Sequence, residues 1–135
     1  MNDIKFLNEF CKSTLIEHLG IEFTEIGENF IVARMPVDYR TIQPMKILHG
    51  GASLALAETV GGAGSFLQID ASRFNVVGMQ VNANHIGSPA EGYVYAHGTL
   101  LHKGTKTHVW DVIITDDNGI KISACRITNM IIEKI

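Results

Sequence analysis

The spacing of hydrophobic and polar positions changes along the chain, and each change predicts a new element. Over residues 3–18 the apolar side chains recur at roughly helical spacing and Gly20 follows as a stop, which predicts a short amphipathic or broken helix. Residues 21–26 and 30–37 alternate between apolar and polar on either side of the turn residues 27–29. This pattern predicts a β-hairpin.

A longer apolar run occupies the middle of the chain. From Gly50 to about Leu67 the residues are apolar or small around the full circumference of a helix, which predicts a helix enclosed on all sides. Turn residues then separate four β-rich runs, at residues 75–85, 92–101, 107–115 and 121–132. We expect one α+β domain over residues 1–135, in which the four runs form a meander and a curved antiparallel sheet wraps around the long helix.

Composition excludes several classes of protein. A chain of 135 residues with 46% hydrophobic and 19% charged residues fits one globular core, and its net charge of −3 argues against a nucleic-acid partner. Residues 47–69 contain five glycines and Glu58, which argues against a membrane span. The amino terminus lacks the basic and apolar pattern of a secretory signal, so we expect a cytoplasmic protein.

Neither the cysteines nor the histidines have the spacing of metal ligands. Cys11 and Cys125 lie far apart and fit no metal-binding pattern, so we expect two reduced thiols and no disulfide. Four histidines likewise have no suitably spaced carboxylate or thiol: His18, His97, His102 and His108. We therefore expect no metal and no bound redox cofactor.

One carboxylate interrupts the long apolar helix. The residues around Glu58 at helical spacing are apolar or small, so the sequence offers it no solvated face. A carboxylate in such surroundings is typical of acid–base and nucleophilic groups, although a buried Glu that bonds a neighbouring chain or water without chemistry fits the same pattern. Gly61 and Gly62 follow on the same face, where glycine either leaves space for a substrate group or lets another helix approach closely.

The start of the same helix offers a second chemical device. Gly50 and Gly51 stand at its expected amino terminus, where N–H groups and the helix dipole can bind a carbonyl oxygen that becomes an oxyanion. Gln43 and His49 lie just upstream and can donate hydrogen bonds there, although a cap or loop-packing role fits His49 equally well.

The spacing between these two devices predicts an oligomer. Glu58 lies eight residues after Gly50, or about 12 Å along one helix, so a single carbonyl group cannot touch both. If both act on one bond, they must come from two subunits of a symmetric dimer.

Two stretches, residues 42–66 and 77–128, closely resemble the hotdog-fold acyl-CoA thioesterases through the order Gln-Pro, His-Gly-Gly, Glu. The nearest group is similar to the 1,4-dihydroxy-2-naphthoyl-CoA, 4-hydroxybenzoyl-CoA and phenylacetyl-CoA thioesterases, and the resemblance extends from about Gly20 to Ile132. It implies a hotdog fold, dimers that pair into tetramers, and Glu58 as the catalytic nucleophile or general base. It also implies that the Gly50 N–H and Gln43 bind the oxyanion and that His49 orders the site.

The resemblance further implies a set of substrate-binding residues. His85 is expected near the thioester or pantetheine arm, and Ser88 lies in a turn that is expected to bind CoA. The loop expected at the CoA phosphates contains His102, Lys103, Gly104, Thr105, Lys106 and Thr107, although such a loop taken alone is more often a solvated hairpin.

The chain departs from the family at one place. Similar enzymes often carry Ser or Thr one turn after the catalytic Glu to hold the attacking water, whereas this chain has Gly62. The substitution implies slower turnover, a substitute hydroxyl from Ser65, or room for a bulkier acyl group.

Together these observations predict an acyl-CoA thioesterase that converts an aromatic or medium-size acyl thioester to the free acid and CoA, with CoA only as part of the substrate. An enoyl-CoA hydratase on the same fold is a weaker alternative, because no Asp here has the His five residues later that similar hydratases carry. A non-enzymatic module that binds acyl-CoA or an acyl carrier is a third hypothesis, and Gly62 favours it.

Overall fold

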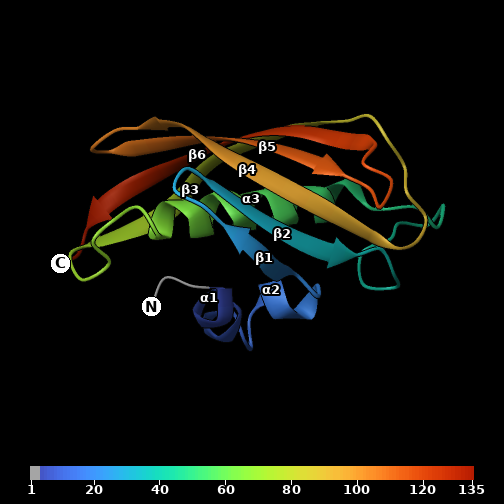
Figure 1. The fold of residues 1–135 in the computed structure, drawn as a ribbon, viewed down its shortest axis with the longest axis horizontal. Helices are drawn as coiled ribbons and strands as arrows, with labels where there is room; N and C mark the ends of the chain where they lie inside the picture. Colours follow the sequence, from blue (N-terminus) through green and yellow to red (C-terminus); the bar gives the residue numbers. More distant parts are fainter. Residues whose placement is uncertain (1–3) are drawn as a thin grey trace.

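The computed structural model describes residues 4–135 (Figure 1). The elements are α1 (Ile4–Phe10), α2 (Leu15–His18), β1 (Glu22–Ile26), β2 (Phe30–Pro36), α3 (Gly50–Phe66), β3 (Phe74–His85), β4 (Tyr93–Lys103), β5 (Thr107–Thr115) and β6 (Lys121–Glu133). The broken amino-terminal helix, the hairpin, the long helix and the later strands are all confirmed within a few residues. Asp3, where the first helix was expected to begin, lies outside the described residues.

The two short helices at the amino terminus are joined by a sharp break. Ser13 adopts a left-handed conformation with φ of 62°, and the Thr14 side chain caps α2 by accepting from the Ile16 N–H. The Asn8 side chain fixes α1 to β1 in both directions: Nδ2 donates to the Phe23 carbonyl at 3.1 Å, and the Phe23 N–H donates to Oδ1 at 2.9 Å. Therefore α1 is held firmly against the edge of the sheet.

Within residues 4–135, six strands form one antiparallel sheet in the order β1-β2-β4-β5-β6-β3. Figure 1 shows the strands curving over α3, with α1 and α2 beyond the helix, near β1. This is the α+β hotdog arrangement that the resemblance implies. In the described part of the chain, no helix is both long and apolar enough to cross a membrane.

The prediction of a four-strand meander was wrong for β3. Strands β4, β5 and β6 follow one another as hairpins, but β3 pairs with β6, from Phe74↔Glu133 to His85↔Ser123, and β4 pairs with β2. The intervening residues 86–92 can span up to about 23 Å, enough to pass the ends of two strands spaced about 4.8 Å apart. Turn residues mark where a strand ends but do not determine which sheet position the chain occupies next.

The edge strand β3 is long and irregular. Its pairing with β6 shifts between Gly78 and Gln80, which is the position of a β-bulge. Val77 and Met79 project from this strand with exposed fractions of 41% and 52%. Exposed apolar residues on an unpaired edge are typical of a strand that receives a partner.

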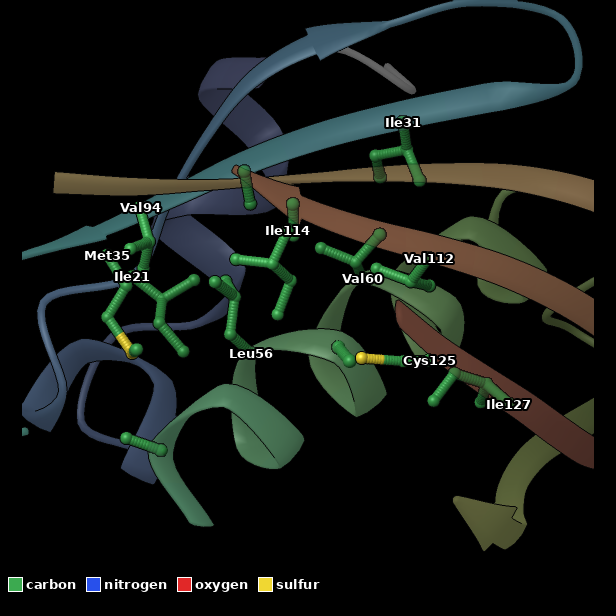
Figure 2. Packing of buried hydrophobic residues seen from close by; sticks show 14 of the residues in the cluster. Ile21, Ile31, Met35, Leu56, Val60, Val94, Val112, Ile114, Cys125 and Ile127 are labelled. Carbon is green, nitrogen blue, oxygen red and sulfur yellow. The ribbon is translucent and has the colours of Figure 1, made fainter. Parts of the chain in front are cut away.

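The core lies between the sheet and one face of α3. Figure 2 shows Leu56 and Val60 of α3 pointing towards Val112 and Ile114 of β5, and all four side chains are fully buried. The prediction that α3 is enclosed on all sides was wrong for the single chain, because its opposite face is left partly exposed. Apolar and small residues on that face had suggested burial by the chain's own sheet.

Glycines allow α3 to approach the sheet closely. A Cβ atom added to Gly64 would lie 2.5 Å from the Trp110 ring, and one added to Gly61 would lie 2.9 Å from Ile127. Gly61 therefore faces the sheet and does not share the open face of Glu58, contrary to the expectation from helical spacing.

Candidate active site

Two different cavities contain six of the candidate residues. Glu58 and Gly62 line a cavity of about 540 Å³ on the open face of α3. Gln43, Gly50, His85 and Ser88 line another of about 410 Å³ at the start of α3. One chain therefore holds Glu58 and the start of α3 in two separate cavities.

The start of α3 is organised by His49 and Gly50. His49 is the N-cap residue, and its Nδ1 accepts from the Gly51 N–H at 2.7 Å. It does not line the cavity itself, so the structure favours the capping interpretation of this residue. A Cβ atom added to Gly50 would lie 2.8 Å from His85 Nε2, so glycine lets the imidazole ring rest on the backbone at the helix start.

His85 is held in place by a buried serine. Its Nδ1 lies 3.0 Å from Ser123 Oγ, and Ser123 Oγ donates to the Asn84 carbonyl at 3.3 Å. These contacts fix the orientation of the imidazole ring, and its Nε2 faces Gly50 and the cavity.

The Gln43 side chain is oriented by its own turn. Its Oε1 accepts from the Met45 N–H, while its carbonyl accepts from the Lys46 N–H at 2.8 Å and its N–H donates to Ile47 at 2.9 Å. Lys46 closes this turn with a φ of 66°. With Oε1 engaged, Nε2 is the amide group oriented to donate, as binding of an oxyanion requires.

Glu58 is exposed in the single chain, so the expectation that it has no solvated face was wrong at this level. Its carboxylate lies against Gly78 of the edge strand β3, where any Cβ atom would collide with it. Glycine at 78 therefore makes room for the acid. The face that exposes Glu58 is the face that the sheet leaves uncovered.

The residues near Glu58 show which consequence follows from Gly62 in place of a Ser or Thr. A Cβ atom at Gly62 would meet nothing described within 4 Å, so this glycine leaves open space inside the cavity. Ser65 does not substitute for a hydroxyl there, because it is fully buried against the sheet. Its Oγ accepts from Trp110 Nε1 at 2.8 Å and from Asn129 Nδ2 at 3.0 Å, and it pairs with His108 Nδ1 at 2.9 Å.

This buried network is neutral. Burial lowers the pKa of His108, and the nearby Lys103 and His102 lower it further. Because Ser65 Oγ already accepts two hydrogen bonds, its own hydrogen is left for His108 Nδ1. Asn129 also donates to the Gly61 carbonyl at 3.0 Å, while its Oδ1 has no hydrogen-bond partner among residues 4–135. Asn129 stands opposite Gly78 in the strand register and lines the Glu58 cavity.

Comparison with known proteins decides the family. A family model described as the Thioesterase superfamily matches residues 45–123. The chain belongs to the thioesterase superfamily. It is 38% identical to the proofreading thioesterase EntH of Cronobacter turicensis, across 95% of this chain and 93% of that protein.

Solved structures of thioesterases have the same fold. A mutant of thioesterase PA1618 from Pseudomonas aeruginosa superposes with a TM-score of 0.96 at 39% identity, covering 98% of this chain and 95% of the other. Thioesterase HI1161 from Haemophilus influenzae gives a TM-score of 0.93 at 38% identity, covering 97% and 91%. These relatives favour thioester hydrolysis over the hydratase and non-enzymatic alternatives.

The loop expected at the CoA phosphates lies elsewhere on the thioesterase. His102, Lys103, Gly104, Thr105, Lys106 and Thr107 form the β4–β5 hairpin end and line neither cavity described above. Lys103 Nζ donates to Gln68 Oε1 at 3.2 Å, just beyond the end of α3, and the Gly104 N–H donates to Thr107 at 2.8 Å. Within one chain this loop is therefore near the opposite end of α3 from Gly50.

Sequence reasoning missed two serines of the thioesterase site. Ser123 fixes His85, and Ser53 is buried in the same cavity one turn after Gly50. The helical spacing of three residues from Gly50 could have indicated Ser53. The role of Ser123 becomes visible only when β3 is paired with β6.

Among the described residues, no group of three or more His, Cys, Asp or Glu side chains could hold a metal ion.

Proposed function

We propose that this thioesterase hydrolyses an aromatic or medium-size acyl-CoA thioester to the free acid and CoA, at a site shared by two copies of the chain. The observation that carries the proposal is the separation of the two cavities towards the two ends of the edge strand β3. Phe74 and Gly78 line the Glu58 cavity, and His85 and Ser88 line the cavity at the start of α3.

Antiparallel pairing of β3 with its copy would join the two half-sites. In such a two-fold pair, the first half of one β3 lies beside the last half of the other. Glu58 of one chain would then approach the Gln43, Gly50 and His85 cavity of its partner. The exposed Val77 and Met79 would be covered in the same step.

The paired site has the groups that thioester hydrolysis requires. The Glu58 carboxylate attacks the thioester carbonyl or removes a proton from the attacking water. The Gly50 N–H and Gln43 Nε2 stabilise the oxyanion, and the helix dipole adds to this effect. The C–S bond then breaks, and the CoA thiolate leaves and takes up the proton that water releases. In the nucleophilic route Glu58 is left acylated, and water then cleaves this anhydride to give the free acid and restore the carboxylate.

The substrate assignment is supported by chemistry at both cavities and at the β4–β5 hairpin. The polar groups of Gln43, His85 and Ser88 suit the amide-rich pantetheine arm, and the exposed Lys103 and Lys106 suit the CoA phosphates. The aromatic side chains of the Glu58 cavity suit an apolar acyl group. We place the enzyme beside the 1,4-dihydroxy-2-naphthoyl-CoA, 4-hydroxybenzoyl-CoA and phenylacetyl-CoA thioesterases, as a cytoplasmic dimer or tetramer.

A subunit-mixing experiment tests the shared site. Glu58→Gln and Gln43→Ala should each have low activity alone, since each removes one half of the site. Dimers re-formed from an equal mixture of the two variants should recover about a quarter of wild-type thiol release, because half of the dimers carry one intact site. Recovery of no activity after verified exchange would show that the site is not shared, and full activity of Glu58→Gln alone would contradict the mechanism.

A further inference from the structure

The Glu58 cavity has a wall that lies outside the residues matched by the family model. The family model matches residues 45–123, whereas Leu7, Phe10, Cys11 and Ile16 line the cavity from the α1–α2 segment. We propose that α1 is the specificity element of this thioesterase, and that Phe10 sets the size of the acyl group it accepts. The inference rests on the proposed function of Glu58.

The acyl group belongs in this cavity because of its lining. Rings of Phe10, Phe66 and Phe74 line it, together with small residues such as Gly62. Its polar residues, Asn75 and Lys134 among them, are few beside this apolar surface. The cavity at the start of α3 combines apolar residues with the hydrogen-bonding side chains of Gln43, Ser53, His85 and Ser88, so it suits the pantetheine arm better than an acyl chain.

Phe10 forms the exposed part of the wall. Its ring stacks on Phe6 and on Phe66 of α3, with centroids 5.5 Å apart in both pairs and interplanar angles of 12° and 24°. It is nevertheless 62% exposed, whereas Leu7 of the same helix is only 2% exposed. Much of the Phe10 ring is therefore free to contact a bound acyl group, and such contacts decide which chain length fits.

The rest of α1 is held in place by the core and by β1, so α1 forms a fixed side of the cavity. Leu7 is part of the core, and Asn8 is bonded in both directions to Phe23 of β1. Gly62 also lines the cavity, from α3, and leaves open space there. The accepted acyl size therefore depends on how far the side chain at residue 10 fills the cavity that Gly62 leaves open.

Phe10→Ala tests the wall, and Phe6→Ala is the matched control. Phe6 belongs to the same aromatic stack but does not line the cavity. The measurement is kcat/KM for thiol release from straight-chain acyl-CoA compounds of increasing length and from benzoyl-CoA. Phe10→Ala should raise the long-to-short ratio by at least about tenfold, the effect of a methylene or more in an apolar pocket. Phe6→Ala should leave the ratio unchanged.

Cys11 gives a second readout that does not depend on turnover. It lines the cavity and is half-buried, and burial raises the pKa of its thiol, whereas Cys125 is buried in the core. A non-hydrolysable acyl-CoA thioether, added at a concentration well above its Kd, should slow alkylation of Cys11 by at least about tenfold. CoA alone should leave the alkylation rate unchanged. Equal protection by CoA alone would place the pantetheine arm here and overturn the proposal.

The two proposals fail in different ways. If the wild-type enzyme releases no thiol from any acyl-CoA compound, the proposed function is wrong. If it does release thiol, but Phe10→Ala and Phe6→Ala share the wild-type length profile, then α1 does not set specificity.

Discussion

The two faces of α3 use the same residue types for opposite purposes. On the face towards the sheet, Gly61 and Gly64 bring the helix into close contact with Ile127 and Trp110. On the open face, Gly62 touches nothing described within 4 Å and leaves space beside Glu58. One face builds the fold and the other leaves room for chemistry, so the effect of a mutation depends on which face it alters.

Substitution of Glu58 on the open face should have the largest effect on activity and little effect on stability. Glu58→Gln should lower kcat for thiol release by at least about 10²-fold, because it removes the proposed catalytic base or nucleophile. The free energy of unfolding should change by less than about 0.5 kcal/mol, since the side chain is exposed in the single chain. Kinetic assays and denaturant unfolding of the same preparation check both. A marked loss of stability with normal kcat would show that the open face of α3 supports the fold and not the reaction.

Gly64→Ala should produce the opposite pattern. The new methyl group would overlap the ring of Trp110, which cannot move easily because it is buried and bonded to Ser65. Overpacking of this kind costs about 1–3 kcal/mol, more than the gain in helix propensity of up to about 1 kcal/mol. Chemical denaturation should therefore show a less stable protein. A stability gain would mean that the close contact with the sheet is not tight.

Gly62→Ala is the matched substitution on the open face. It should stabilise the protein by up to about 1 kcal/mol, because alanine favours the helix and no neighbour is displaced. The same denaturation assay applies, at protein concentrations that keep the oligomer constant. Destabilisation here would indicate that a partner helix approaches this face, which is the other interpretation of the glycine.

A smaller effect should appear in the pH dependence of stability. Burial lowers the pKa of His108 below its ordinary value of 6.5, so below that pH the unfolded chain binds a proton that the folded chain does not. The stability linked to His108 is therefore complete above about pH 6.5 and decreases as the pH falls towards the lowered pKa. Unfolding measured between pH 5 and pH 8 should show a shallower decrease for His108→Gln. An equal slope in both proteins would exclude His108 as its source.

Local sequence patterns predicted the elements well but not their neighbours. The apolar run from Gly50 gave the bounds of α3 almost to the residue, because such a run has no strand-like alternation. The turn residues 88–92 could not reveal that β3 pairs with β6, since turn chemistry is local and strand order is not. For the same reason Ser123 escaped notice, because its bond to His85 exists only in that pairing.

The candidate site was predictable where chemistry is unusual and unpredictable where geometry decides. Glu58 stood out as the one charge in an apolar helix, and Gln43 and Gly50 came from the motif. Ser65 was misjudged: seven residues place it almost in line with Glu58 along a helix, yet the sheet covers Ser65 and leaves Glu58 open. A sequence does not show how far a twisted sheet extends across a helix.

The bulge in β3 has a consequence for the newly made chain. A straight apolar edge would accept almost any extended peptide, and fibrous aggregates grow by such additions. The register shift between Gly78 and Gln80 interrupts the ladder midway, so a foreign strand cannot continue along it in regular spacing. In the proposed pair, a second molecule of the same sequence would carry the matching irregularity, so the edge would favour its own copy over a growing fibre.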